Sequence, residues 1–586
     1  MAKTGKPRHP LHVLRVIVQL AFLGLFLALL AMTMRGVLLP GRPWLAHLFL
    51  ISDPLALAAA IAAGTVSGAL LAGLAVLVLS LILPRAYCGW VCPLGTTMDI
   101  ADRLLFRRRD RSKSQTPRLR QAKYGLLAAL LVLAAMGHNL FGWVDPISIA
   151  TRAYALALHP MADRAAKAGL VAAEEAGAPA AAHAYDWARR HRLLLEDADL
   201  KEDAKWYGYR WGGAFLAILL GIVLVQAYQK RFWCRNLCPL GALLGLVGSA
   251  SPLRPRVSRE CISCNRCREG CKTGAFEPRA GEKTYRGVVQ ECISCYACER
   301  AFCPVGAIHI GWGRPRTGPV RGVLPGRRAF LASAAAGAVA GPALALDLAT
   351  RRKQESNPML RPPGALRPDE QFQAACIRCG ACMRACPKNA LHPAGLENGL
   401  AGLWASTFVF NIGHCEYFCA VTREEVESGA AGRRPANLCG IVCPTGAIAA
   451  LTQDEKAKWK IGTAEFDKDR CLPWARGESC LTCEEQCPLP EKAISHQMAD
   501  VPNPDWLKMS DAARNRFEQL QAKRAAGGLS PEEEKELAAM PPRTRRLALP
   551  YVLRDRCTGC GVCENVCPVE GPSGVRVQRL LTRDIR

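Results

Sequence analysis

Apolar residues gather in the first 230 positions of the chain, in runs long enough to cross a membrane. Four runs approach the roughly 20 residues that a helix needs to span a hydrocarbon core of roughly 30 Å. They cover residues 13–34, 54–83, 124–143 and 211–228. A secretory signal peptide is the alternative for the first run, but its apolar core is too long. The pattern predicts an α-helical membrane domain of four spans over residues 1–250.

Charge sets the expected orientation of these spans. Segment 85–123 carries ten Lys/Arg against three Asp/Glu, including the triplet 107–109, and is predicted to be cytoplasmic. Segment 145–210 carries nine against ten and is predicted to lie outside, with short helices in its Ala-rich stretch 161–182. The N-terminus is then cytoplasmic. The same bias accounts for the formal net charge of +26, so we expect no nucleic-acid partner.

A cysteine motif follows the second run and recurs after the fourth. Cys88-Gly-Trp-Val-Cys92 and Cys234-Arg-Asn-Leu-Cys238 are each followed by Pro-Leu-Gly. Proline after the second cysteine suits the first position of a helix, whose N-terminus favours thiolates. The repeat predicts an additional redox or metal site. A structural pair of buried thiols is the alternative, and the sequence leaves open whether the four thiols share one site.

The remaining cysteines point to iron–sulfur chemistry. Of the 28 cysteines, all but Cys88 and Cys92 lie after residue 230, and they recur as Cys-x-x-Cys-x-x-Cys and Cys-x-x-x-Cys-Pro. This is the spacing of [4Fe–4S] ligands, and the chain is too long for a small secreted disulfide scaffold. Zinc is the alternative for paired Cys-x-x-Cys, but four cysteines in each motif disfavour it.

Residues 251–315 are predicted to form a cytoplasmic ferredoxin with two clusters. In two-cluster ferredoxins the fourth cysteine of each motif reaches the other cluster. That rule assigns one cluster to Cys261, Cys264, Cys267 and Cys303. It assigns the other to Cys292, Cys295, Cys298 and Cys271. Lys272 stands where proline is usual, and one extra residue precedes Cys303, but neither departure removes a ligand.

Segment 316–346 is predicted to be a twin-arginine signal or a fifth apolar segment. Arg327 and Arg328 directly precede an apolar run to Leu346. Two surface arginines before a buried helix are the alternative. Export is favoured because the preceding spans return the chain to the cytoplasm and a cysteine-rich domain follows. Ala343-Leu-Ala345 resembles a cleavage site, so cleavage after Ala345 and retention both stay open.

Residues 347–586 are predicted to form a periplasmic ferredoxin with four clusters, which brings the total to six. The four ligand groups are Cys376, Cys379, Cys382 and Cys386; Cys415, Cys419, Cys439 and Cys443; Cys471, Cys480, Cys483 and Cys487; and Cys557, Cys560, Cys563 and Cys567. The charged stretch 505–546 contains no cysteine and predicts a helical insertion that serves as a docking surface. The predicted fold is therefore an α-helical membrane domain with α+β ferredoxin-like domains.

On these motifs the chain resembles two families joined end to end. Residues 1–315 resemble the NapH-type membrane ferredoxins, and residues 325–586 resemble the NapG/MauM-type ferredoxins with their twin-arginine signal. The resemblance implies a quinol dehydrogenase in a bacterial inner membrane. Its electrons would pass from menaquinol or ubiquinol to a periplasmic reductase of the nitrate or nitrous oxide type, or to a cytochrome c.

Analogy with four-cluster subunits of membrane oxidoreductases implies how the fourth cysteines of the exported domain are exchanged. The outer two groups would exchange with each other, and so would the inner two. The implied sets are Cys376, Cys379 and Cys382 with Cys567; Cys557, Cys560 and Cys563 with Cys386; Cys415, Cys419 and Cys439 with Cys487; and Cys471, Cys480 and Cys483 with Cys443.

Two residues are candidates to accept quinol protons. His138 and Asp145 lie near the outer end of the third run, and a packing role is the alternative for His138. The cytoplasmic and exported clusters would lie across a core of roughly 30 Å, too far for one tunnelling step. No Cys-x-x-Cys-His is present to attach a c-type haem. A mobile quinone, the Cys-x-x-x-Cys-Pro thiols or another cofactor would have to connect them, unless the two halves work separately.

Two other function classes stay open. Related cytoplasmic Cys-x-x-x-Cys-Pro ferredoxins reduce copper for oxidase assembly, so a copper-handling assembly factor is the main alternative. The exported four-cluster domain argues against it, because assembly needs no such electron path. A redox sensor is the third class, and no recognisable signalling domain supports it.

Overall fold

The protein is described by a computed structural model that covers residues 9–33, 47–106, 119–175, 183, 208–279, 284–313, 324–352 and 359–579. Two compact units are present. The first comprises Met1–Asn357, Pro362–Thr407 and Cys419–Gln453; the second comprises Pro358–Arg361, Phe408–Phe418 and Asp454–Arg586. The first half of the predicted exported domain thus belongs largely to the same unit as the predicted membrane domain. The basic triplet 107–109 lies outside the described residues.

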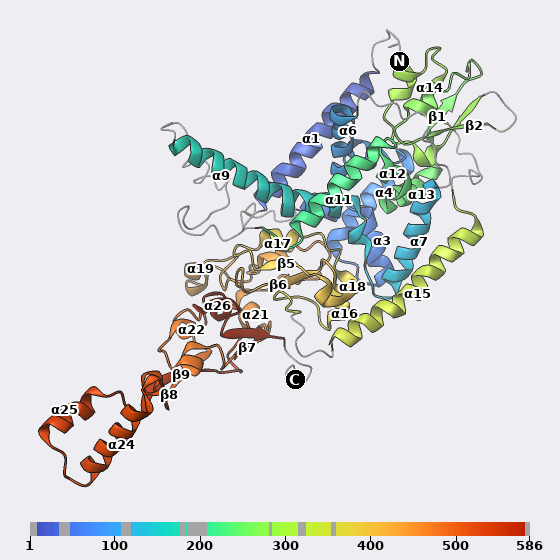
Figure 1. Cartoon of the computed structure of the whole chain (residues 1–586). Coiled ribbons are helices and arrows are strands. Elements are labelled where there is room, and N and C mark those ends of the chain that lie inside the picture. The colour runs from blue at the N-terminus through green and yellow to red at the C-terminus, as the bar shows by residue number, and fades with distance from the viewer. Residues whose placement is uncertain are drawn as a thin grey trace. The chain divides into compact units, whose positions relative to one another are not determined.

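The first unit contains a bundle of apolar helices (Figure 1). Its helices are α1 (Pro10–Met32), α2 (Leu48–Ile51), α3 (Pro54–Ala63), α4 (Ala72–Ile82), α7 (Ala122–Ala135), α8 (Pro146–Arg152), α11 (Gly212–Leu224) and α15 (Arg327–Arg352). Helix α9 (His159–Glu175) extends away from this bundle in Figure 1. Among the described residues, α1 and the Arg327–Asp347 part of α15 are long and apolar enough to cross a membrane. The other apolar helices are shorter, so the first predicted run forms one long helix and the next three do not.

Local backbone geometry explains the shorter helices. The second predicted run divides at Gly64, which ends α3 in the left-handed conformation with φ 69°. The chain then re-enters the bundle through a 3-10 turn, Gly68–Leu71, that leads into α4. The third predicted run leaves the helix near Gly137, whose φ is 84°. Glycine adopts such angles without steric cost, so it ends helices within otherwise apolar runs.

The internal repeat predicted from the two Cys-x-x-x-Cys-Pro motifs is confirmed as a structural repeat. The first motif forms α5 (Ala86–Trp90) and α6 (Pro93–Leu105), and the second forms α12 (Phe232–Asn236) and α13 (Pro239–Val247). In each repeat the second cysteine caps the N-terminus of the longer helix and proline takes its first turn. Each motif therefore begins a helix, as the sequence predicts.

A small ferredoxin-like module follows the second repeat. Strands β1 (Leu253–Val257) and β4 (Ile308–Trp312) pair in an antiparallel register that sets Leu253 opposite Trp312. Strands β2 (Phe276–Pro278) and β3 (Tyr285–Gly287) form a second antiparallel pair. Helix α14 (Arg266–Gly270) and a π-helical turn, η10 (Cys298–Phe302), carry cysteines of the two motifs. The predicted α+β character is confirmed here.

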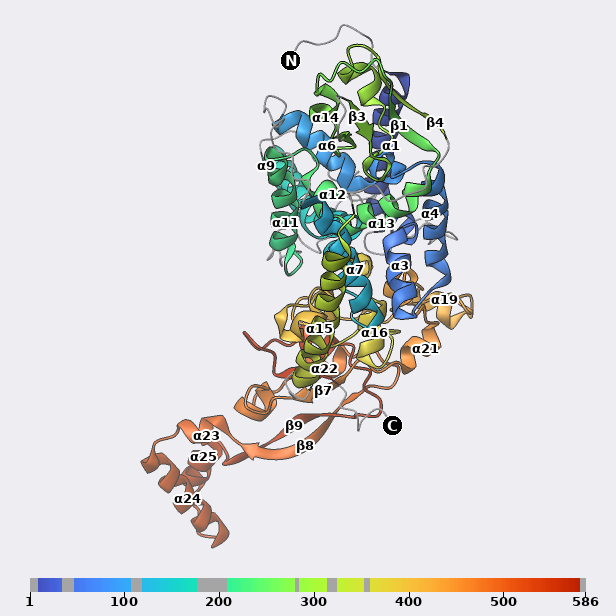
Figure 2. The same cartoon turned by 90° about the vertical axis from the view of Figure 1, so that its right-hand side faces the viewer.

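The predicted signal segment is one continuous helix that packs along the bundle. Helix α15 lies beside α7 in both views (Figures 1 and 2). A side chain added at Gly337 would lie 2.7 Å from the carbonyl oxygen of Ala129. Gly125 of α7 similarly faces Ser333 of α15. The pairing order shows that the two helices run parallel, and small residues let their backbones approach closely.

The first unit also contains the first part of the predicted exported domain. Its elements are α16 (Asp369–Ala375), α17 (Ala381–Ala385), α18 (Gly399–Gly402), α19 (Arg423–Glu427), α20 (Leu438–Ile441) and the paired strands β5 (Leu391–Pro393) and β6 (Ser406–Phe408). These short elements place cysteine loops at the start and end of α17 and beside α20.

The second unit is a ferredoxin-like module with a long insertion. Strands β7 (Thr463–Phe466) and β10 (Val575–Gln578) pair antiparallel, and α21 (Gln453–Lys458), α22 (Thr482–Glu485) and α26 (Val562–Asn565) accompany them. The insertion begins and ends with the antiparallel strands β8 (Ile494–Pro502) and β9 (Thr544–Val552). Between them lie α23 (Pro504–Lys508), α24 (Asp511–Ala525) and α25 (Pro531–Ala539), packed around Trp506, Phe517, Leu520 and Leu537. The helical insertion is confirmed; its docking role stays a prediction.

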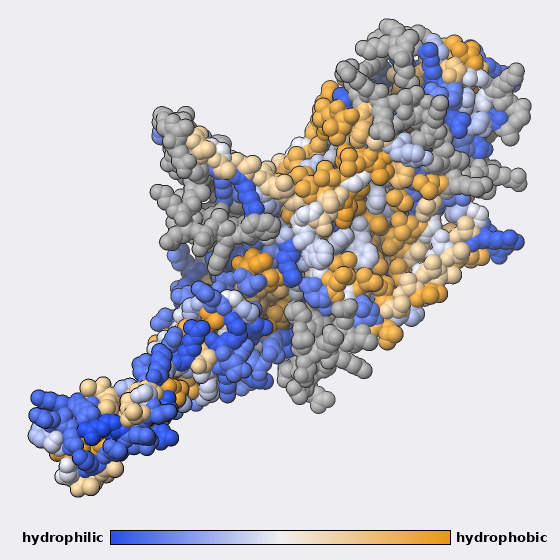
Figure 3. Space-filling model, viewed as in Figure 1, coloured by the Kyte–Doolittle hydropathy of each residue, from blue (hydrophilic) through white to orange (hydrophobic). Residues whose placement is uncertain are grey.

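Apolar side chains cover much of the surface of the helical bundle in Figure 3. Exposed large apolar residues include Leu14, Ile17, Leu20 and Leu27 on α1, Leu74, Val78 and Leu79 on α4, and Leu331, Val339 and Leu346 on α15. Contiguous apolar surface of this kind marks contact with lipid or another apolar partner.

The close approach of α7 and α15 generates a stability prediction. Gly337→Leu should separate the two helices and lower the free energy of unfolding by about 1–3 kcal/mol, because the new side chain overlaps the α7 backbone. Thermal unfolding of the purified protein in detergent measures the change. Gly221→Leu is the matched control, since no atom lies within 4 Å of a side chain added at that position of α11. Equal melting temperatures for the two variants would contradict the packing.

Candidate metal centres

The two cysteine sets predicted for segment 251–315 are confirmed as neighbours in space. Site 1 is a cavity of about 310 Å³ whose lining includes Cys261, Cys264, Cys267 and Cys303. Site 2 is a cavity of about 380 Å³ whose lining includes Cys271, Cys292, Cys295 and Cys298. The fourth cysteine of each motif therefore lies with the first three of the other motif, as in two-cluster ferredoxins.

Both departures from the usual motif have a structural reason. Lys272, which replaces the usual proline, extends its ammonium group to within 2.9 Å of Asp99 on α6. The extra residue before Cys303 is absorbed by the π-helical turn η10, in which the Cys303 N–H donates to the Cys298 carbonyl at 3.2 Å. A π-helical turn accommodates one inserted residue without displacing the residues after it.

Backbone N–H groups point at the sulfur atoms of the exchanged cysteines. The Ala275 N–H donates to Cys271 Sγ at 3.3 Å, and the Ala307 N–H donates to Cys303 Sγ at 3.1 Å. Such donors stabilise a thiolate and tune a bound cluster.

The implied exchange between groups of the predicted exported domain is wrong. Cys443 interacts with Cys376, Cys379 and Cys382, and these four thiols define site 3. Cys386 neighbours Cys419 of the second group, and this pair marks site 4. The first group therefore exchanges its fourth cysteine with the second group, and not with the last.

The third and fourth groups exchange with each other inside the second unit. Site 5 is a cavity of about 330 Å³ whose lining includes Cys471, Cys480, Cys483 and Cys567. In site 6, Cys487 interacts with Cys560, which in turn neighbours Cys557 and Cys563. Consecutive groups pair because shorter connecting segments lose less entropy when their ends are brought together.

One cysteine of the second group falls in the other compact unit. Cys415 lies in Phe408–Phe418, where its N–H donates to the Cys560 carbonyl oxygen at 2.8 Å. Its predicted place with Cys419 and Cys439 stays a prediction.

The four thiols of the membrane repeat come together at one buried place. Cys92 interacts with Cys88 and Cys234, and Cys238 interacts with all three others. This membrane thiol site is almost closed to solvent, with each cysteine at most 5 % exposed. The Gly241 N–H, in the first turn of α13, donates to Cys238 Sγ at 3.3 Å. The question that the sequence left open is therefore answered: the four thiols share one location.

Two arginines, one from each repeat, donate hydrogen bonds to the cysteine motifs that form the membrane thiol site. The Arg85 guanidinium donates to the carbonyl oxygen of Cys234 at 3.0 Å, and the Arg231 guanidinium donates to that of Cys88 at 3.0 Å. Arg231 also forms two bonds of 2.9 Å to the Asp99 carboxylate. Arg85 is held by the fully buried Glu291 at 2.6 Å. Each repeat is thus bound by the arginine that begins the other.

The residues present fit iron–sulfur clusters. Burial raises the pKa of the Cys379 thiol to about 12 and that of Cys471 to about 11, so the free thiols hold their protons at neutral pH. Iron binding releases those protons, because the thiolate is the ligand. Among the described residues, no three His, Cys, Asp or Glu side chains lie close enough together to hold one metal ion. A cubane asks for a wider set, since each thiolate binds a separate iron atom.

Site 2 packs directly against the membrane thiol site. The Trp90 indole N–H donates to the Ser294 carbonyl oxygen at 3.1 Å. Gly89 leaves no room for a side chain, because the Ile293 carbonyl oxygen occupies that space. Both contacts join the first Cys-x-x-x-Cys-Pro motif to the loop that begins with Cys292.

Site 3 packs against the helical bundle in the same unit. Arg152 at the end of α8 donates to the carbonyl oxygens of Gly142 at 2.6 Å and Arg378 at 2.9 Å. Gly142 meets the Ile377 carbonyl oxygen where a side chain would otherwise stand. The cysteine loop that begins at Cys376 therefore packs on the loops between α7 and α8.

The two predicted proton acceptors lie near the contact between site 3 and the loops that connect α7 to α8. His138 follows α7, is 7 % exposed and has no partner for Nδ1 among the described residues. Asp145 caps α8 through a 2.6 Å bond from the Ser148 N–H, and its carboxyl group faces that of Asp53. Asp145 therefore has a structural role, and the part of either residue in proton transfer stays a prediction.

Comparison with known proteins agrees with this arrangement. A family model described as a 4Fe-4S binding domain matches residues 66–113 and 211–259, the two segments of the repeat. A second model with that description matches residues 372–392 and 550–572. The ferredoxin-type protein NapG of Escherichia coli is 30% identical over 42% of this chain and 84% of its own length.

Two further relatives extend the comparison. The methylamine utilization ferredoxin-type protein MauM of Methylorubrum extorquens is 30% identical over 43% of this chain and 89% of its own length. The chain belongs to the NapG/MauM family of ferredoxin-type proteins. The ferredoxin-type protein NapH of Haemophilus influenzae is 28% identical over 42% of the chain and 71% of its own length, so a NapH-type part is fused to the NapG/MauM-type part. No solved structure matches the chain.

The fused NapH and NapG/MauM parts make this an iron–sulfur electron-transfer protein. The sequence found all the clustered cysteines. It missed Asp99, Glu291 and the arginines they hold, for which the only signal was an arginine three residues before each motif.

The corrected exchange in the NapG/MauM-type part predicts a difference between two double variants. Cys376→Ser with Cys443→Ser should remove about four iron atoms per protein, because both ligands serve one cubane. Cys376→Ser with Cys567→Ser should remove about eight, because the ligands serve two cubanes. Iron and acid-labile sulfide are measured on the purified, anaerobically handled proteins. The reverse order of losses would restore the exchange between outer groups.

Proposed function

We propose that this protein is a quinol dehydrogenase component that passes electrons from the quinol pool to a periplasmic reductase or cytochrome c. Menaquinol and ubiquinol are both suitable donors, and reductases of the nitrate or nitrous oxide type are suitable acceptors. The proposal places the NapH-type part in a bacterial inner membrane with its N-terminus in the cytoplasm. It assigns six [4Fe–4S] clusters to the 24 cysteines of the ferredoxin motifs.

The observation that carries the proposal is the position of cysteine sets at two ends of one helical bundle. Site 2 packs on the membrane thiol site through Trp90, and site 3 packs on the loops between α7 and α8 through Arg152. When bound, [4Fe–4S] clusters take up and release single electrons, which suits the two-electron oxidation of a quinol. The membrane thiol site is proposed as a further cluster or metal site.

The direction of α15 supports the proposed topology. Helix α15 begins at Arg327 and runs parallel to α7, so it leads the chain toward the end of α7 where site 3 is seated. That is the direction of an export signal that starts in the cytoplasm. Gly337 and Ser333 pack against α7, so removing the helix would uncover an interhelical surface. We therefore propose that α15 is retained as a fifth span and not cleaved after Ala345.

A copper-handling role is the second candidate, and one observation favours it. The Met98 sulfur lies 3.7 Å from Cys234 Sγ, so thiols and a thioether meet in one buried place. Soft sulfur ligands select Cu(I).

The central experiment asks whether a quinol reduces the clusters. The anaerobically purified protein, oxidised beforehand, is mixed with duroquinol or a menaquinol analogue and frozen for electron paramagnetic resonance. Reduced cubane signals should grow with quinol concentration. Dithionite provides the control for intact clusters. If dithionite produces the signals and no quinol does, while stoichiometric copper is bound at the membrane thiols, the copper-handling role replaces the dehydrogenase.

The topology has its own test. A reporter fused after Arg586 should be active outside the cytoplasm, and Arg327→Lys with Arg328→Lys should keep it inside, because the twin-arginine route requires both guanidinium groups. An antibody to an N-terminal tag should detect the tag and the reporter on one polypeptide. Arg423→Lys with Arg434→Lys is the control for a general effect of such changes. Equal export of both double variants would disprove the signal, and separate polypeptides would disprove retention.

A further inference from the structure

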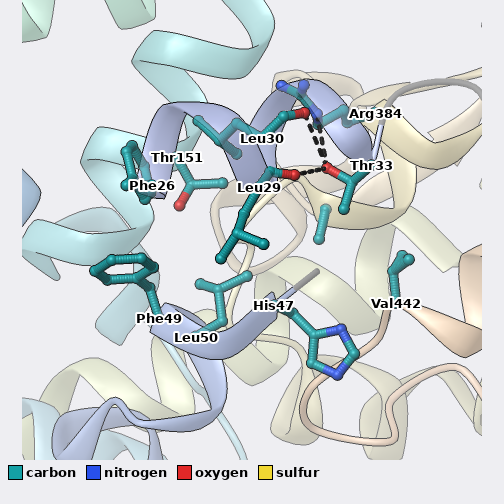
Figure 4. A pocket seen from close by; sticks show the side chains of 11 residues that line it. Phe26, Leu29, Leu30, Thr33, His47, Phe49, Leu50, Thr151, Arg384 and Val442 are labelled. Carbon is teal, nitrogen blue, oxygen red and sulfur yellow. Dashed lines mark hydrogen bonds between the residues drawn. The ribbon is translucent and has the colours of Figure 1, made fainter. Parts of the chain in front are cut away.

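A cavity in the first unit lies at the C-terminal end of α1, beside the cysteine loops of site 3 (Figure 4). Its empty space amounts to about 430 Å³, which includes space open to the surroundings. Its lining residues are Phe26, Leu29, Leu30, Thr33, His47, Phe49, Leu50, Thr151, Ala381, Arg384 and Val442.

Most of the wall is apolar and aromatic. Phe26 and Phe49 meet edge to face with ring centroids 5.3 Å apart. Leu29 and Leu50 line the space between them and the polar end of the cavity (Figure 4). Leu27, on the same helix, is 41% exposed on the apolar surface of the bundle.

The polar end contains two buried side chains that are not satisfied. Arg384 is 3% exposed and donates through Nε to Thr33 Oγ1 at 3.1 Å. Its Nη1 and Nη2 atoms have no hydrogen-bond partner among the described residues. His47 is 8% exposed, and its Nδ1 atom likewise has no partner there. Buried polar groups without partners are costly, so the Arg384 donors and the His47 ring nitrogen indicate a ligand that carries hydroxyl or carbonyl oxygen atoms.

The cavity also adjoins the ligands of site 3. Ala381 directly precedes Cys382, and Val442 directly precedes Cys443. Both cysteines belong to the same set of four thiols. A molecule in the cavity is therefore one residue away from two ligands of one cluster site.

From these observations we infer that the cavity binds the head group of a quinol, with Arg384 donating to one ring oxygen and His47 facing the other. This inference rests on the proposed function and names its substrate site. Neither His138 nor Asp145 lines the cavity, so it assigns the quinol contacts to different residues.

Oxidation of a quinol in this cavity releases two protons and two electrons, and the surrounding groups can accept both. Two O–H bonds of the quinol break, the two ring oxygens become carbonyl groups, and two protons and two electrons leave. His47 Nδ1 accepts each proton in turn and releases it to water. Cys376, Cys379, Cys382 and Cys443 would hold a [4Fe–4S] cluster beside the cavity, and such a cluster, when bound and oxidised, would take up the two electrons one at a time. The Arg384 guanidinium stabilises the negative charge that develops on the ring oxygen it contacts.

The experiment measures binding and reduction separately on the full-length protein. A photoreactive azido-quinone is cross-linked in detergent and the labelled peptides are identified by mass spectrometry. Label should fall on segments that contain Leu29, His47 or Arg384. Leu29→Trp fills the cavity and should weaken labelling by roughly ten-fold. Leu27→Trp is the matched control on the exposed side of α1 and should label like the unchanged protein.

A second variant guards against misfolding of the first. His47→Phe keeps an aromatic ring but removes the acceptor, so it should slow cluster reduction by quinol. Reduction by dithionite and iron content should stay unchanged. Normal labelling in Leu29→Trp, or an unchanged rate of cluster reduction by quinol in His47→Phe, overturns the site.

These outcomes separate the site from the proposed function. If quinol reduces the clusters while the variants behave normally, the dehydrogenase stands and the site lies elsewhere. If the cavity is labelled but quinol reduces no cluster, the binding inference stands and the dehydrogenase fails.

Discussion

The first unit depends on the reciprocal hydrogen bonds between two arginines and the opposite cysteine motifs. Arg85 binds the Cys234 carbonyl, and Arg231 binds the Cys88 carbonyl. Both arginines adopt a left-handed backbone, with φ of 47° and 48°, which costs a non-glycine residue about 1–2 kcal/mol. The bonds offset that strain and hold the repeats face to face. These bonds therefore help to bring the four thiols of the two repeats to one buried location.

Buried guanidinium groups need counter-charges. The carboxylates that supply them connect the membrane thiol site to site 2. Glu291 neutralises Arg85 and is the residue directly before Cys292. Asp99 neutralises Arg231 and also meets Lys272, the residue directly after Cys271. Cys271 and Cys292 both line site 2. The ion pairs that stabilise the membrane thiol site therefore also position site 2 against it.

The sequence predicted the features that depend on local spacing. Cysteine spacing predicted which thiols lie together in sites 1 and 2, and proline after Cys92 predicted the helix that begins there. The pairing of groups within residues 347–586 was taken from analogy and is wrong, because four equivalent motifs satisfy the spacing rule in several ways. The sequence also missed the break at Gly64, where hydropathy continues although the backbone turns. His47 had no motif around it, and only its burial beside an unpaired arginine draws attention to it.

The two ends of the bundle differ in the hydrogen-bond partners of their buried arginines. Arg85 and Arg231 are each paired with a carboxylate and with carbonyl groups, so protein alone closes the end that carries the membrane thiol site. Arg152 donates to two carbonyl oxygens where site 3 is seated. Arg384 has the same burial but only the Thr33 hydroxyl as a hydrogen-bond partner among the described residues, and a cavity lies beside it. The inferred quinol would supply acceptors for the two Nη atoms of this buried charge, which has neither a carboxylate nor a carbonyl partner among the described residues.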